Sequence, residues 1–201
     1  MRRPDTSRPQ YPRRGAAGSF VWLLVIAGFP LLAAFGLMLR WRPPTIPEAV
    51  VGVVLYTVAG LGVSLGWHRL FTHRGFRCTP WLERVLAVSG SLAFEGSLAS
   101  WVANHRVHHA HTDVEGDPHS PWTSDGKVRG FLHAHVGWLG RPFADERRFA
   151  RDIHNDASLS RISRFWWLFA LGGMLMPAVV AGTFSGWRGF VGMFVWAGLL
   201  R

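Results

Sequence analysis

Three uncharged runs dominate the pattern of apolar and polar positions along the chain. They extend over residues 15–39, 49–67 and 165–187, and each is apolar enough to form a membrane-spanning helix. A helix rises about 1.5 Å per residue, so roughly 20 residues cross a hydrocarbon core of about 30 Å. A soluble fold of this size needs no such runs, so the pattern predicts an all-α integral membrane protein.

The same pattern predicts three complete transmembrane helices and the start of a fourth. We expect the complete ones at about 19–39, from 48 to beyond 67, and 165–183. The apolar run at 189–200 starts a fourth span, and the sequence stops at Arg201 before that run crosses. The chain is therefore expected to be truncated at its C-terminal end.

The remaining segments are polar or too short to cross. Residues 1–17 are basic and proline-rich, which is typical of a disordered terminus. The apolar stretch 85–94 favours a helix lying at the membrane surface. Residues 112–130 are mostly turn formers, with breaks at Asp117-Pro118 and Asp125-Gly126.

Positive charges accompany the apolar runs. The formal net charge of +10 would suit nucleic-acid binding, but Lys127 is the only lysine and no recognised nucleic-acid motif is present. Arginines gather at residues 2–14 and 141–164, as in cytoplasmic segments that flank spans, although Arg40 and Arg42 depart from this rule. We expect a multi-pass protein with its N-terminus in the cytoplasm. The single cysteine, Cys78, excludes a disulfide framework and a cysteine-based zinc site.

Five histidines form two clusters beside apolar segments. His68 and His73 follow the second apolar run, and His105, His108 and His109 lie together further on. A lone histidine near a membrane is usually solvated, but neutral imidazole also binds iron, copper and zinc. Two clusters, each beside an arginine at the end of an apolar segment, indicate a shared metal site at a membrane surface.

The spacing of the histidines restricts how they can share an ion. At about 100° per residue, those at 105, 108 and 109 share one helix face and can bind one metal or bridge two. His68 and His73 are about 140° apart on a regular helix. We therefore expect both to reach one ion only if the helix unwinds or ends between them, and Gly75 suits such an end.

Four segments resemble the membrane fatty-acyl desaturase family, the acyl-CoA Δ9 type in particular. They are GWHRLFTHRGF (66–76), WVANHRVHHAHTD (101–113), GDPHS (116–120) and HAHVGWL (133–139). The resemblance implies a four-helix membrane fold, capped on the cytoplasmic side by helices and loops that carry the histidine boxes. It also implies a di-iron centre that uses O2 and two electrons to remove two hydrogens from an acyl chain.

The resemblance also implies ligands and partners. His68, His73, His105 and His109 would surround one iron, with His108 turned toward the other. The substrate would be a long-chain acyl-CoA or acyl-lipid, and ferredoxin or a cytochrome b5-like protein with its reductase would supply electrons. The family's later Asn and His ligands and its third histidine box are absent, so we expect residues 18–201 to be the N-terminal part of the domain, an inactive fragment by itself.

Carboxylates and further histidines beside the boxes are candidates for orienting the ligands. Metal-bound imidazoles usually donate their second N–H to a carboxylate or carbonyl. Glu95, Asp113 and Asp117 are candidates for that role, and solvated or loop-capping carboxylates are the alternative. We expect His119, His133 and His135 to be structural residues or head-group contacts. His111 and His154 are expected at the surface.

Aromatic and cationic residues near the boxes suggest a substrate path. Trp67, Phe71, Trp101 and Trp138 are candidates for lining an acyl tunnel or for an interfacial aromatic belt. Arginine binds phosphate by paired hydrogen bonds, so an anionic head such as a CoA phosphate or a lipid headgroup would meet Asn104, Arg106 and Arg74.

Two other functions stay open. A histidine-box hydroxylase, ketolase or alkane oxygenase would use the same metal but insert oxygen. A non-catalytic membrane metal-binding fragment would need no reaction at all.

Overall fold

The computed structural model describes residues 42–123, 126–140 and 143–201. Within these ranges every regular element is a helix, which confirms an all-α architecture. The predicted disordered terminus and the first predicted span, residues 19–39, lie outside the described residues. The elements are α3 Ile46–Leu61, η2 Gly62–Thr72, α4 Pro80–Ser91, α5 Leu98–Ala110, η3 Pro121–Thr123, α6 Lys127–His135, η4 Gly137–Gly140, α7 Glu146–Phe149, α8 Arg151–Asn155, α9 Ala157–Arg164, α10 Trp166–Met193 and η5 Phe194–Leu199.

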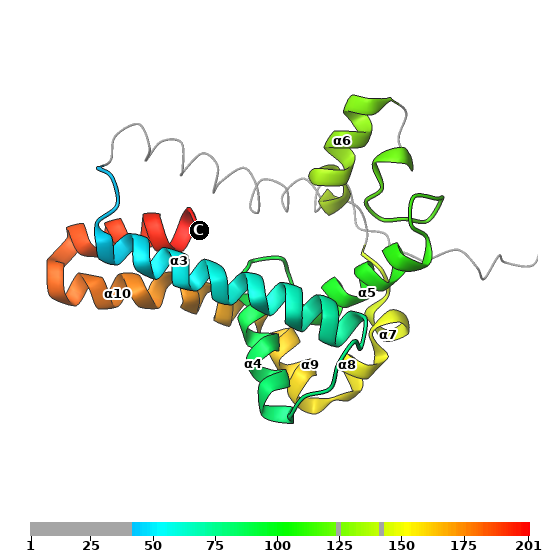
Figure 1. Cartoon of the computed structure of the whole chain (residues 1–201), viewed down its shortest axis with the longest axis horizontal. Helices are drawn as coiled ribbons and strands as arrows, with labels where there is room; N and C mark the ends of the chain where they lie inside the picture. Colours follow the sequence, from blue (N-terminus) through cyan, green and yellow to red (C-terminus); the bar gives the residue numbers. More distant parts are fainter. Residues whose placement is uncertain (1–41, 124–125, 141–142) are drawn as a thin grey trace, which may run out of the picture.

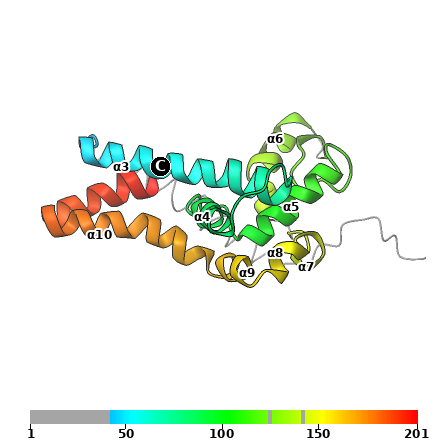
Figure 2. The same ribbon diagram turned by 60° about the horizontal axis from the view of Figure 1, so that its bottom comes forward.

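Two of these segments are long and apolar enough to cross a membrane. They are Ile46–Thr72, formed by α3 and η2, and Trp166–Leu199, formed by α10 and η5. They lie alongside each other, and the shorter helices gather around the end of η2 (Figures 1 and 2). Many of their apolar side chains are exposed, including those of Val53, Tyr56 and Phe184. Such a surface suits lipid better than water.

The segment Trp166–Leu199 is a helical hairpin. Its first arm agrees with the helix expected at about 165–183, because it begins at Trp166 and reverses at Gly186. Gly186 has φ 60° and ψ −155°, a backbone conformation that glycine adopts readily. The returning arm packs so tightly that a Cβ on Gly189 would lie 2.6 Å from the Ala181 carbonyl oxygen. The apolar run 189–200 therefore returns alongside α3 (Figure 1).

An ion pair at the start of α3 packs against this returning arm. Arg42 donates to both carboxylate oxygens of Glu48, at 2.8 and 2.7 Å, and the Thr45 N–H donates to the same carboxylate at 2.8 Å. The Glu48 side chain is buried. It fits only because the facing residue is Gly192, where a Cβ would collide with Glu48 Oε1.

The main core lies where η2 crosses α4 and α5. Trp67 is fully buried there, and its Nε1–H donates to the Ala87 carbonyl at 3.1 Å. Gly62 of η2 and Gly90 of α4 let these two helices approach closely. A Cβ on Gly62 would collide with the α4 backbone, and a Cβ on Gly90 would collide with the Trp67 indole. Trp67 is thus a packing residue, and the expectation that it lines a substrate tunnel or an aromatic belt is wrong. The buried residues of this core are Trp67, Leu70, Phe71, Ala87, Leu98, Ala99, Val102, Ala103, Val107, Ala144, Ala150, Ile153 and Leu159.

Replacing Gly90 by alanine tests this packing. The new methyl group would overlap the Trp67 indole, so we expect Gly90→Ala to destabilise the fold by about 1–3 kcal/mol. The matched control is Gly60→Ala on exposed α3, where a Cβ meets nothing within 4 Å and helix propensity predicts a gain of about 0.5–1 kcal/mol. Thermal unfolding in detergent micelles measures both. Equal midpoints for the two variants would contradict the packing.

Candidate metal centre

The first histidine pair comes from a π-helical segment, which is the unwound geometry that the spacing of His68 and His73 requires. Within η2 the backbone bonds skip one more residue than in an α-helix, and the His73 N–H donates to the His68 carbonyl at 3.1 Å. Residues five apart then share a face. The helix is wound less tightly there, as expected for a pair that reaches one ion. It ends at Thr72 with His73 as its C-cap; Arg74 then adopts φ 51°, and the Gly75 N–H donates to the Arg69 carbonyl at 2.9 Å.

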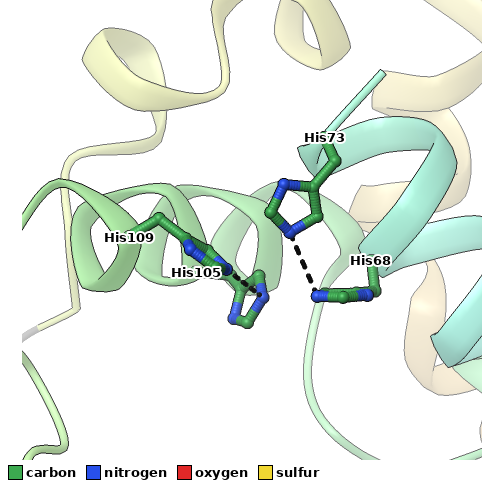
Figure 3. Close-up of side chains that lie close together, drawn as sticks. All are labelled: His68, His73, His105 and His109. Carbon is green, nitrogen blue, oxygen red and sulfur yellow. Dashed lines mark hydrogen bonds between the residues drawn. The ribbon is translucent and has the colours of Figure 1, made fainter. Parts of the chain in front are cut away.

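The second pair comes from one face of α5. The helix starts at the N-cap Ser97, whose side chain accepts from the Ser100 N–H at 3.2 Å. One turn separates His105 from His109, whose Nε2 atoms lie 3.2 Å apart. The Nε2 atoms of the first pair lie 3.1 Å apart and face them (Figure 3).

These four imidazoles form the four-histidine group: His68, His73, His105 and His109. One ring nitrogen from each lies within 4.8 Å of the others. Two ligands about 2.1 Å from one ion, at neighbouring positions, are about 3.0–3.4 Å apart. Both Nε2 pairs have that separation, so the donors fit a single transition-metal ion.

The environment favours the neutral imidazoles of His105 and His109. Burial, followed by the neighbouring imidazoles, lowers the pKa of His105 to about 3. Burial and the same neighbours also lower the pKa of His109. A neutral imidazole offers the lone pair that a metal needs. These two histidines can therefore bind an ion without first losing a proton.

Trp101 supports His105 from the side. Its ring stacks on the imidazole with centroids 4.7 Å apart and planes at 29°. The indole Nε1–H donates to Glu95 at 2.7 Å. The expectation that Glu95 orients a histidine is therefore wrong, because its described contact is with the tryptophan. Trp101 itself contacts a member of the four-histidine group, and no acyl tunnel is needed to explain its position.

His108 points away from the four-histidine group into a second cluster with Asp117 and His119. The His108 Nδ1 lies 2.9 and 3.0 Å from the Asp117 carboxylate oxygens. The His119 ring stacks on His108 with centroids 4.3 Å apart. Ligand atoms of these three residues lie within 4.8 Å of one another. The pattern expected for Asp117, a carboxylate that accepts from a box histidine, is present in this geometry.

The Asp117 carboxylate also holds its loop. It is buried and accepts the N–H groups of Asp113 and His119, each at 3.0 Å. Desolvation alone would raise its pKa, but the hydrogen bonds from His108 and from these two N–H groups lower it. Asp113 instead accepts from the Ser120 hydroxyl at 2.8 Å, so no histidine contact supports its expected orienting role.

Arg106 is a structural crosslink, which corrects its expected role as a head-group ligand. It donates to both oxygens of Asp152, at 2.7 and 2.8 Å, to the Phe149 carbonyl at 2.8 Å and to the Phe71 carbonyl at 2.6 Å. Arg74 reaches the same carboxylate at 3.0 Å. Desolvation would raise the pKa of Asp152, yet the two arginines lower it well below its usual range. Asp152 went unnoticed in the sequence, where no spacing signal connects it to an arginine 46 positions away.

Asn104 and Phe71 also belong to the packing. Asn104 is buried, donates to the Ser100 carbonyl at 2.8 Å and accepts the Ala144 N–H at 3.0 Å. The expectation that Asn104 contacts a substrate head is therefore wrong, because its side chain, like that of Arg106, is taken up by hydrogen bonds within the protein. Phe71 lies in the core.

The remaining candidates lie outside both groups. Trp138 contacts His119 with ring centroids 5.3 Å apart. His133 is buried, while His135 is exposed on α6 with its Nδ1 2.8 Å from the Phe131 carbonyl. His154 is exposed, and His111 is half-buried at the end of α5.

Comparison with known proteins agrees with this geometry. The family model for fatty acid desaturase matches residues 44–201. The hex-5-enoyl-[acyl-carrier protein] acetylenase of Moorena producens (strain JHB) is 34% identical over 82% of this chain and 54% of its own length. The sn-1 stearoyl-lipid 9-desaturase of Anabaena variabilis is 35% identical over 77% and 57%. The probable acyl-CoA desaturase of Schizosaccharomyces pombe is 31% identical over 90% and 37%.

The chain belongs to the fatty acid desaturase family, a membrane-bound family. Its relatives act on acyl groups attached to different carriers, as their names state. The chain spans about half the length of the curated relatives that it matches first.

The low pKa of His105 predicts how the metal-free fold responds to acid. The unfolded chain takes up a proton at this residue near its ordinary pKa of 6.5, while the folded chain stays neutral down to about pH 3. Stability should therefore fall as the pH drops from 6.5 toward 3. Asp152 loses its contribution only below its ordinary pKa of 3.8, so it does not contribute to the fall between pH 6.5 and 4.5. Glu95 and Glu146, whose pKa values are raised by burial, titrate in the same way in the wild type and in a His105 variant, so the comparison of the two proteins reports His105.

Thermal unfolding with chelator at several pH values measures this effect. We expect His105→Phe, which keeps a ring against Trp101, to show a shallower fall in midpoint than the wild type between pH 6.5 and 4.5. Parallel curves for the two proteins would contradict the burial of a neutral His105.

Proposed function

We propose that this protein is the histidine-box part of a fatty acid desaturase that introduces a cis double bond into a long acyl chain. The observation that carries the proposal is the four-histidine group, in which imidazoles from η2 and α5 converge at single-ion distances in a chain of this family. Breaking an unactivated C–H bond is beyond amino-acid side chains, so a metal must supply the oxidising power.

The four-histidine group would hold one iron, and His108 would face the second. Bound iron supplies O2 activation, with electrons from an external donor of the ferredoxin or cytochrome b5 kind. The protein's own contribution is to present neutral imidazoles, fix their directions and exclude water. Asp117 would fix the His108 tautomer by accepting from Nδ1, which leaves Nε2 free as the donor atom.

The two apolar segments would span the bilayer, with both histidine clusters on its cytoplasmic side. Their exposed apolar faces and the arginines at 141–164 support this orientation. The acyl substrate would approach from the lipid as a CoA thioester or a lipid ester. Arg74 has a largely exposed side chain and, among the described residues, one ion-pair partner, so it stays within reach of an anionic head where Arg106 does not.

A matched pair of histidine variants tests the proposal. His109→Ala removes one member of the four-histidine group, whereas His154→Ala removes an exposed histidine on α8. Iron per purified chain, measured by mass spectrometry, should fall by about one ion in His109→Ala and stay at the wild-type level in His154→Ala. Equal iron in all three proteins would contradict the assigned site.

Product analysis separates desaturation from metal binding alone. In cells that produce this chain joined to the C-terminal part of a family member, which supplies the third histidine box, chromatography of fatty-acid methyl esters should show additional cis-monoenoic acids with the wild-type sequence and His154→Ala, and none with His109→Ala. Hydroxylated acids in their place would contradict desaturation. Bound iron without any altered acyl chain would leave a metal-binding protein and contradict the proposed reaction.

The Asp117 carboxylate gives a second test. Asp117→Asn keeps the size but removes the charge that accepts from His108, so metal affinity at the His108 side should fall by about 10–100-fold. The control is Asp113→Asn, since Asp113 accepts from a serine and from no described histidine. Zinc titration followed by calorimetry measures both. Unchanged affinity in Asp117→Asn would show that Asp117 only caps its loop.

A further inference from the structure

Helix α6 presents an apolar stripe away from the rest of the molecule. Val128, Phe131 and Leu132 occupy positions i, i+3 and i+4, which share one helix face. Their exposed fractions are 73%, 58% and 55%. The opposite face carries buried Gly130 and buried His133, and a Cβ on Gly130 would collide with the Pro121 carbonyl oxygen. The helix therefore turns its apolar face outward and its small residue inward.

Positive charges flank the stripe. Lys127 and Arg129 lie about 100° to either side of Val128 and are both exposed. Trp122, in the turn just before, is 73% exposed. Cations beside an apolar stripe, together with an exposed tryptophan, are typical of helices that lie in the boundary between lipid headgroups and acyl chains.

The placement of α6 favours lipid over a soluble partner. The helix lies at the end of the molecule that carries the histidine groups, and it runs across the direction of α3 (Figure 1). The loop that contains Pro121 lies on the side of α6 away from the long helices, so the stripe, on the opposite face, looks toward the side where α3 and α10 extend. A helix across the spans, with its apolar face toward them, lies parallel to a bilayer surface.

We propose that Val128, Phe131, Leu132 and Trp122 form a membrane foot that inserts into the cytoplasmic leaflet, with Lys127 and Arg129 on anionic lipid headgroups. The foot is linked to the cluster of His108, Asp117 and His119, because Trp138 follows α6 closely in the chain and its ring contacts His119. A lipid contact at α6 would therefore act on this cluster. It would hold that cluster at a fixed height over the acyl chains. The inference needs only the membrane spans and does not depend on the desaturase reaction.

Site-directed spin labelling of the whole chain in lipid nanodiscs tests the foot. Cys78 is the only cysteine, so Cys78→Ser gives a background for single labels. The test sites are Phe131→Cys and Leu132→Cys. Val179→Cys on exposed α10 is the lipid control, and Arg147→Cys on exposed α7 is the water control. Collisions of the label with O2 report lipid, and collisions with a water-soluble nickel chelate report water.

The foot predicts lipid-like labels at both test sites, with O2 collisions approaching those at residue 179 and nickel collisions well below those at residue 147. In a Lys127→Gln, Arg129→Gln background, the labels should become less buried in anionic lipid, while neutral lipid shows little difference. High nickel collisions would place the stripe in water. Low collisions with both reagents would show that protein covers it, from this chain or a second copy. Either result would overturn the proposal, and two neighbouring test sites guard against one misfolded variant.

Discussion

The site depends on the π-helical hydrogen-bond pattern of η2. A regular α-helix would direct His68 and His73 about 140° apart, whereas the π-helical bond from His73 to the His68 carbonyl brings them together. Such a wide turn is stabilised by its surroundings. Gly62 and Gly66 allow α4 to pack closely against it, with a Cβ on Gly66 only 2.9 Å from the Leu86 Cβ. Trp67 completes the contact from the centre of the core.

A single carboxylate then fixes the two halves of the four-histidine group to each other. Asp152 binds Arg106, the neighbour of His105, and Arg74, the neighbour of His73. Arg106 also reaches the Phe71 carbonyl within η2. The group is thus held from behind by charge-assisted bonds, while the ring nitrogens on its other side face one another. Arg106 is occupied by these protein contacts, whereas Arg74 contacts the same carboxylate and stays largely exposed.

Much of this arrangement can be predicted from the sequence. The rest cannot, for identifiable physical reasons. The histidines at 105 and 109 are one regular turn apart, so their shared face follows from helix periodicity alone. The pairing of His68 with His73 does not, because tertiary packing sets the π-helical register. Their position beside the boxes predicts substrate contacts for Trp67, Asn104 and Arg106. Their actual partners, at residues 87, 144 and 152, are separated from them by stretches that no local pattern connects. The break between the runs 165–187 and 189–200, at Arg188, lies close to the reversal at Gly186, but hydropathy does not show that the second run folds back along the first.

The most direct test of the central claim is X-ray absorption spectroscopy of the chain loaded with substoichiometric zinc. If η2 and α5 form one site, the zinc should have a shell of nitrogen ligands at about 2.0–2.1 Å, with multiple scattering that fits the four imidazoles of His68, His73, His105 and His109. A shell with two or fewer imidazoles would contradict the account, because the histidine pairs of the two helices would then act separately.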